Sequence, residues 1–185
     1  GETNTRLRVT NYNPTYLLRH HTAEGKHEYL ISNTILNADF VINLPKAKTH
    51  IKAGLTGAMK NMVGINGQKE FLPHHTQGSF TEGGDQFKSK NLFKNIYNRA
   101  YDYYWSRLSN FSSPVRVFLK YFLKGILLLA FITSGEKHIE GSWSGNFTVA
   151  RMTIDLNNIL YFWSCKLHKL SQTTSIFHDR FPRLK

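Results

Sequence analysis

The chain has 185 residues, of which 41% are hydrophobic and 19% are charged, and its formal net charge is +12. This composition indicates a globular domain with a core and excludes a disordered chain, and the positive charge favours anionic partners. A single cysteine, Cys165, excludes a disulfide framework and any four-cysteine iron–sulfur or zinc site within the chain.

The first part of the chain alternates β-type and helix-type segments. Residues 6–12 read as a short strand, and residues 27–37 have apolar residues at a helical spacing. Residues 40–44 are apolar and uncharged, which is typical of a buried strand in a parallel sheet, and Pro45 ends this run. Residues 54–63 predict a helix with an apolar stripe. We therefore expect an α/β domain with a mostly parallel sheet flanked by helices.

The second part is richer in helix. Residues 64–90 carry many glycines and polar residues and predict a long loop, a kind of segment that is often functional. Residues 91–132 predict a helix-rich insertion, broken by a Ser-Ser-Pro sequence. Residues 150–162 predict a last helix, which ends a partial domain that begins at residue 1. Residues 163–185 follow as an atypical basic tail.

Basic residues and glycines are concentrated directly after the predicted strand. His50 is the expected acid/base, because imidazole exchanges protons near neutral pH, and Lys60, crowded by other cations, is the second catalytic candidate. The crevice beyond a strand end is a usual ligand position, whereas the spacing G-x-x-G-x-x-K is not that of a Walker A loop. The other residues expected to contact an anion are Lys46, Lys48, Gly54, Thr56, Gly57 and Asn61. The alternative is a solvated basic loop whose glycines serve only for turns.

A histidine pair in the long loop is a weaker candidate for metal binding. His74 and His75 could ligate one ion if the backbone is irregular, and Asp85 could supply a carboxylate, although a turn aspartate is the more common case. A later turn-rich loop and the start of the next helix are expected to add to the site. The residues concerned there are Trp143, Asn146 and Arg151. The histidines expected at the surface, without partners, are His20, His21 and His27.

The insertion contains one very apolar stretch, residues 115–132. Lys120 and Lys124 interrupt it, so it falls short of the roughly 20 apolar residues of a membrane span. It is either a core helix or a peripheral contact with a membrane surface. Nucleic acid is not expected as a partner, because the basic and aromatic residues 88–107 match no recognition motif. We expect a cytoplasmic location, with a peripheral position at a membrane as the alternative.

Five motifs occur in order within residues 27–87 and 141–160: VINLPKAKTH, AGLTGAMKNMVGING, LPHH, EGGDQF and GSWSGNFTVARMTIDLNNIL. Together they resemble the domain-of-unknown-function 362 family of prokaryotic proteins, which implies an α/β domain of unassigned activity. Some members carry ferredoxin-like cysteine motifs, which this chain lacks, so no iron–sulfur cluster is expected. The family continues into a further glycine-rich segment that is absent here. Because the chain also starts at Gly1, we expect that N- and C-terminal parts of the same protein are missing.

A second resemblance concerns the run H-x-x-A-G-x-x-G-x-x-K, formed by His50, Ala53, Gly54, Gly57 and Lys60. It is similar to a segment of the nickel-pincer lactate racemase family, in which the histidine is an acid/base, the lysine tethers the cofactor and a later histidine ligates nickel. The resemblance implies that His50 moves a proton, Lys60 anchors a cofactor or anionic ligand and His75 binds metal. Other racemase motifs are absent from the chain.

These observations predict an uncharacterised enzyme, or an enzyme-derived domain, that binds a small anionic substrate or cofactor through the Lys/His/Gly segment. The alternative is a non-catalytic basic module that binds an anionic polymer or a membrane surface through its net charge. The cofactor is unknown, and a metal held by His75 is the one candidate.

Overall fold

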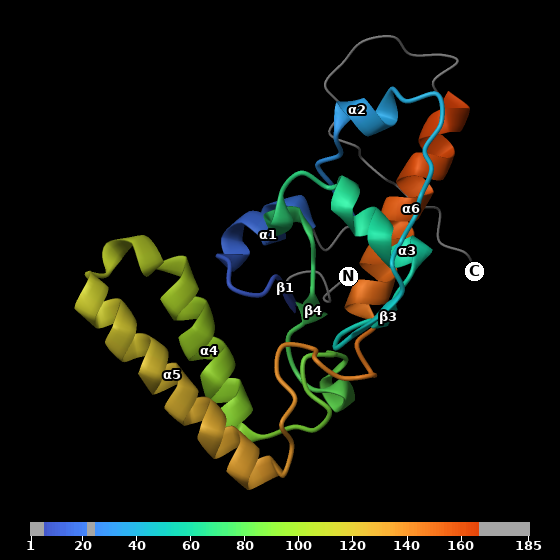
Figure 1. The fold of residues 1–185 in the computed structure, drawn as a ribbon. Coiled ribbons are helices and arrows are strands. Elements are labelled where there is room, and N and C mark those ends of the chain that lie inside the picture. The colour runs from blue at the N-terminus through green and yellow to red at the C-terminus, as the bar shows by residue number, and fades with distance from the viewer. Residues whose placement is uncertain (1–5, 22–24, 167–185) are drawn as a thin grey trace.

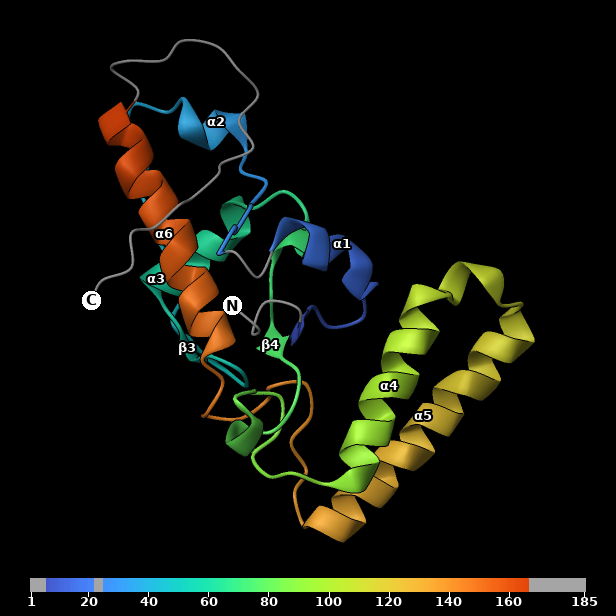
Figure 2. The ribbon, with the colours of Figure 1, turned by 180° about the vertical axis from the view of Figure 1, so that it is seen from behind.

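The computed structural model describes residues 6–21 and 25–166, with side chains described up to residue 162. Nearly all of the predicted tail 163–185 lies outside these residues. Figures 1 and 2 show a body, in which the long helix α6 (Thr148–Lys166) runs along one side, and a hairpin of two helices that projects from the other side.

The described strands are short, and they pair antiparallel. β1 (Leu7–Arg8) pairs with β4 (His75–Thr76), and β2 (Lys48–His50) pairs with β3 (Gly54–Thr56). The fold is therefore mixed α/β, but the mostly parallel sheet that the sequence predicts is not present among the described residues.

The predicted buried strand, residues 40–44, is exposed and forms no strand. Phe40 and Leu44 are 89% and 86% exposed. The side-chain amide of Asn43 ties the segment to the body by donating to the carbonyl oxygen of Ala58 at 2.6 Å. A strand needs a neighbouring strand to bond with, and no described residue supplies one here. The apolar residues of this run favour β structure, but without a partner strand the run is neither paired nor buried.

Other elements differ from the prediction at their boundaries. The helix predicted over residues 27–37 is reduced to α2 (Asn33–Leu36). The helix predicted over residues 54–63 starts as β3, because these residues close a hairpin, and continues as α3 (Ala58–Asn61) and a 3₁₀ turn. The last helix, α6, begins two residues earlier than predicted.

The main core lies under α6. Its apolar residues Val149, Met152, Leu156 and Ile159 recur at spacings of three and four, so they form one buried stripe. The partners of this stripe come from the N-terminal region and from the long loop: Tyr29, Ile31, Leu36 and Leu72. The long loop is therefore anchored to the core through Leu72, although its composition is mostly polar.

The predicted insertion is a hairpin of α4 (Leu92–Ser106) and α5 (Ser113–Ser134). In both views α4 lies between α5 and the rest of the molecule, next to α1 (Pro14–His20). The guanidinium of Arg8 forms an ion pair with the carboxylate of Asp102 on α4 at 3.0 Å. The hairpin is thus joined to the β1 side of the body through α4.

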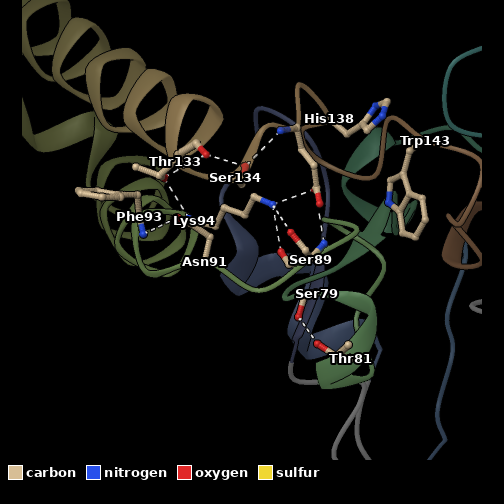
Figure 3. A network of polar contacts seen from close by, with 12 residues as sticks. Ser79, Thr81, Ser89, Asn91, Phe93, Lys94, Thr133, Ser134, His138 and Trp143 are labelled. Carbon is tan, nitrogen blue, oxygen red and sulfur yellow. Dashed lines mark hydrogen bonds and ion pairs between the residues drawn. The ribbon is translucent and has the colours of Figure 1, made fainter.

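A buried ion pair closes the base of this hairpin. The ammonium of Lys94 donates to Glu136 Oε2 at 2.9 Å and to the carbonyl oxygen of Ser89 at 3.0 Å, and only 1% of Lys94 is exposed. Figure 3 shows Lys94 reaching from α4 across to Ser89, with the Asn91–Thr133 hydrogen bond of 3.0 Å beside it. The two ends of the hairpin are therefore held together where they leave the body.

Glu136→Gln is expected to lower the free energy of unfolding by about 3 kcal/mol, because it leaves the buried ammonium of Lys94 without an opposite charge. The double variant Lys94→Met/Glu136→Gln should recover part of this loss. Urea denaturation followed by circular dichroism measures both. The matched control is Lys90→Met, which breaks the exposed Lys90–Glu82 pair and should cost less than about 1 kcal/mol. Equal losses in Glu136→Gln and the control would contradict this role of the buried pair.

Candidate anion-binding site

Except for Lys46, the predicted anion-binding residues lie on the β2–β3 hairpin and on α3, which follows it, or at the junction between them. In the hairpin, Lys48 pairs with Thr56 and His50 pairs with Gly54. Gly54 has φ +71°, a left-handed conformation that glycine adopts without strain. The basic residues therefore belong to the hairpin itself, and they do not follow the end of a parallel strand as the sequence predicts.

The hairpin turn fixes the ring of His50. Its Nδ1 accepts hydrogen bonds from the backbone N–H groups of Lys52 and Ala53, both at 3.1 Å. A neutral ring whose Nδ1 is an acceptor carries its proton on Nε2. Burial, and then the charges of neighbouring lysines with Lys60 foremost, lower the pKa of His50. His50 can therefore donate a hydrogen bond to an anion, but it can take up a proton only if the turn releases Nδ1.

Lys60 lies among other basic side chains of this region. Burial, and then the charge of Lys48, lower the pKa of Lys60. The charge of Lys60 in turn lowers the pKa of His50 and contributes to the low pKa of His74, which lies on the long loop. The structure thus brings together the basic side chains of Lys48, His50, Lys60 and His74, which we call the cation cluster. Its positive charge near neutral pH is carried by the two lysines, because the pKa values of both histidines are lowered.

Lys52 belongs beside this cluster, although the sequence-based set of site residues leaves it out. It is 8% exposed, and its Nζ donates to the hydroxyl of Thr10 at 2.7 Å. Burial lowers the pKa of Lys52 to about 8, against the opposing effect of the charge of Glu140. Burial and then the charge of Lys52 lower the pKa of His74 to about 4. The sequence shows Lys52 within the basic run, but nothing local shows that it is buried.

The lysines of this region form no ion pair with a described carboxylate, although the charges of Glu140 and Asp85 act on Lys52 and raise its pKa. Among the described residues, Lys48, Lys52 and Lys60 form no ion pair with a carboxylate. Holding like charges close together costs free energy, and a bound anion would offset that cost. The arrangement is therefore suited to a negatively charged ligand.

A groove of about 440 Å³ adjoins the cation cluster at Lys60. Most of its lining is apolar: Ala53, Leu55, Ala58, Met59, Ala150 and Ile154. On β3, close by in the chain, the hydroxyl of Thr56 is buried, and no described residue forms a hydrogen bond with it. The volume lies in the range of small-molecule sites, so the groove could hold the body of a ligand whose charged end meets Lys60.

Two of the predicted anion contacts lie apart from this arrangement. Lys46 is exposed and belongs to the irregular segment before β2. Asn61 donates from its side-chain amide to Asn43 Oδ1 at 2.8 Å, so its amide helps to fasten the exposed segment to α3.

The predicted metal ligands do not form a metal site within the described residues, which contain no cluster of three or more His, Cys, Asp or Glu side chains able to hold an ion. His74 and His75 are adjacent where β4 begins, and neighbouring side chains of an extended segment point to opposite sides. The Nδ1 of His74 is bonded to the carbonyl oxygen of Leu72 at 2.6 Å. The Nδ1 of His75 is buried and has no hydrogen-bond partner in the part of the chain that the structure describes, and burial holds the pKa of His75 well below its usual value.

Asp85 is fully buried, and its carboxylate is occupied by backbone groups. Oδ1 accepts from the N–H of Thr76 at 2.6 Å, and Oδ2 accepts from the N–H groups of Phe147 and Thr148 at 3.0 and 2.7 Å. A carboxylate at the start of a helix also interacts favourably with the helix dipole. Asp85 therefore joins β4 to the first turn of α6, and this use explains why it is not available to a metal.

The residues predicted to form a second part of the site hold this same region in place. Trp143 donates from Nε1 to the carbonyl oxygen of Asp85 at 2.8 Å. The amide of Asn146 donates to the carbonyl oxygens of His74 and Gly141 at 2.9 and 3.0 Å. Arg151 is exposed, with its guanidinium 4.8 Å from the centre of the Phe147 ring. Trp143 and Asn146 thus position the loop that carries His74.

A family model described as "Domain of unknown function (DUF362)" matches residues 3–176. The chain belongs to this family. The match includes the cation cluster, the helical hairpin and α6, and it continues past residue 162. No curated protein and no solved structure matches the chain. The similarity of residues 50–60 to the nickel-pincer lactate racemase family stays a prediction.

One pair of histidines is less exposed than the sequence predicts. His21 is fully buried, with Nε2 2.9 Å from the carbonyl oxygen of Phe71 and Nδ1 2.9 Å from Nδ1 of His27. Burial, followed by the charge of His27, lowers the pKa of His21 to about 3. His20, also expected at the surface, lies 2.7 Å from the carboxylate of Glu28. These histidines help to fasten the end of α1, so they are not free surface residues.

Asp85→Asn is expected to lower the free energy of unfolding by about 2–4 kcal/mol, because an amide cannot accept hydrogen bonds at both positions from the three N–H groups. Chemical denaturation measures the loss, and Asp39→Asn, at an exposed position, is the control. Addition of EDTA should leave the melting temperature of the wild type unchanged. A drop with EDTA, restored by a divalent metal, would contradict the structural role of Asp85.

Stability should fall as the pH decreases from about 6.5 to 4.5. The pKa values of His21 and His74 are lowered to about 3 and about 4 in the folded state, against 6.5 for a free ring, so below pH 6.5 the unfolded state binds more protons. The melting temperature across this range measures the effect. His21→Gln should flatten the slope, and His138→Gln, at an exposed position, is the control. A melting temperature that is constant or rises toward pH 4.5 would contradict the prediction.

Proposed function

We propose that this domain binds a small organic anion, as substrate or cofactor, with the charged group at the cation cluster and the apolar part in the adjoining groove. The observation that carries the proposal is the concentration of Lys48, Lys52 and Lys60 in one region, where none of them forms an ion pair with a described carboxylate. Such a domain would be an enzyme, or a domain derived from an enzyme.

The donors of this region fit a carboxylate or phosphate group. Lys60 lines the groove and offers an ammonium, His50 offers Nε2–H, and the buried hydroxyl of Thr56 has no hydrogen-bond partner among the described residues. Bonds between charged donors and an anion are about twice as strong as neutral ones. These groups come from β2, β3 and α3, which are adjacent in the hairpin and the helix after it, so their positions are fixed locally.

His50 is better placed for binding than for proton transfer in this geometry. Its Nδ1 accepts from two backbone N–H groups, so protonation of the ring would break both bonds. The charges of the neighbouring lysines also lower the pKa of His50 and so disfavour its protonation. An acid/base role would therefore require the turn after β2 to open when the ligand binds.

Lys60→Ala is expected to weaken binding of a short-chain carboxylate such as octanoate by about tenfold or more, because a charge-assisted contact contributes about 1.5–3 kcal/mol. Isothermal titration calorimetry measures the affinity, with acetate and inorganic phosphate as probes that lack an apolar part. Octanoate should bind more tightly than acetate, and Met59→Gln, in the groove, should reduce that difference.

The control is Lys137→Ala, which removes a charge at an exposed position outside the cluster. Similar losses for Lys60→Ala and Lys137→Ala, with a steep dependence on salt, would favour the alternative of a basic module that binds anionic polymers through its net charge. No saturable binding of any probe would overturn the proposal.

A further inference from the structure

The helix α5 has an apolar face that nothing in the described residues covers. Its inner face packs on α4 through Leu123, Ile126 and Ala130, which are buried. Its outward face is formed by large apolar side chains that are between 46% and 69% exposed: Phe118, Tyr121, Phe122, Leu128, Leu129 and Ile132. Soluble monomers rarely expose a continuous apolar surface of this kind without a partner for it.

The outward face is one continuous stripe. At about 100° per residue, its six residues span an arc of about 120° along the length of the helix. Figures 1 and 2 show α5 on the far side of α4 from the body, so the stripe is accessible along the hairpin. None of the described helices is both long enough and apolar enough to cross a membrane.

The charges around this face have one sign. Residues 113–134 contain Arg116, Lys120 and Lys124 and no acidic residue, and the one acid of residues 92–134, Asp102, is paired with Arg8. Lys120 and Lys124 lie at one edge of the outward face, where a lysine stem can lie along the apolar surface while its ammonium reaches polar headgroups.

We propose that the outward face of α5 lies in the interface of a membrane that carries anionic lipids. The aromatic rings of Phe118, Tyr121 and Phe122 enter the region between headgroups and acyl chains, and Lys120 and Lys124 meet the lipid phosphates. This site is separate from the cation cluster, and it rests on different residues.

A second copy of the chain is the main competing occupant of this face. A symmetric α5–α5 contact would bring Lys120 and Lys124 of both copies into one interface in which α5 offers no carboxylate to neutralise them. An anionic bilayer supplies the negative charge that a second α5 lacks. The charge pattern therefore favours lipid.

Sedimentation with vesicles tests the proposal on the full chain. The protein should pellet with phosphatidylcholine vesicles that contain phosphatidylserine, and more weakly with phosphatidylcholine alone or at high salt. Phe118→Gln/Phe122→Gln should reduce the partition coefficient by at least about tenfold, because the membrane-bound state loses two aromatic rings that insert into the interface. Lys120→Gln/Lys124→Gln should remove most of the preference for the anionic lipid.

The matched control is Tyr103→Gln, an exposed aromatic position on α4 outside this face, which should leave the partition coefficient unchanged. Circular dichroism checks that each variant is folded, and Phe122→Trp gives a second readout, a blue shift of its emission on vesicles. The proposal is overturned if the wild type does not pellet with anionic vesicles, or if the double phenylalanine variant pellets as well as the wild type. It is also overturned if the wild type is a dimer without lipid and the phenylalanine variant is a monomer.

Discussion

The carboxylate of Asp85 joins parts of the chain that would otherwise be separate. It lies in the long loop, it bonds to the backbone of Thr76 in β4, and it accepts from the first turn of α6, more than sixty residues later. The backbone N–H of Asp85 also donates to the carbonyl oxygen of Thr76 at 3.0 Å, so the contact with β4 is reciprocal. A carboxylate is needed here because three converging N–H groups require acceptors at a position from which water is excluded.

The position of the cation cluster depends on this junction. β4 and the residues before it carry His74, and Asn146 holds His74 from the loop that Asp85 also fixes. The β2–β3 hairpin then brings Lys48, His50 and Lys52 toward this loop, and α3 adds Lys60. The region therefore combines a hydrogen-bonded support with lysines that form no ion pair with a described carboxylate. The hydrogen bonds of Asp85 and the proposed contacts with an anion involve different residues, so Asp85 and His74, grouped together by the sequence as metal ligands, have different surroundings.

The hairpin of α4 and α5 is a second unit with its own support. Lys94 and Glu136 close its base, and Arg8 pairs with Asp102 along α4. The inner face of α5 packs on α4, and this contact holds the helix in the fold although no described residue covers its outward apolar face. The hairpin and the cation cluster can thus be changed independently of each other.

The sequence by itself determined the helices α4, α5 and α6, the basic character of residues 46–60 and the family, because helical periodicity, local charge and short motifs are properties of neighbouring residues. Only the tertiary structure decided that Lys52 and His21 are buried, that Asp85 is occupied by backbone N–H groups and that residues 40–44 are exposed. Those outcomes depend on contacts between residues far apart in the chain, such as Lys52 with Thr10 and Asp85 with Thr148. A strand-like run or a charged side chain looks the same in the sequence whether or not such a distant partner is present.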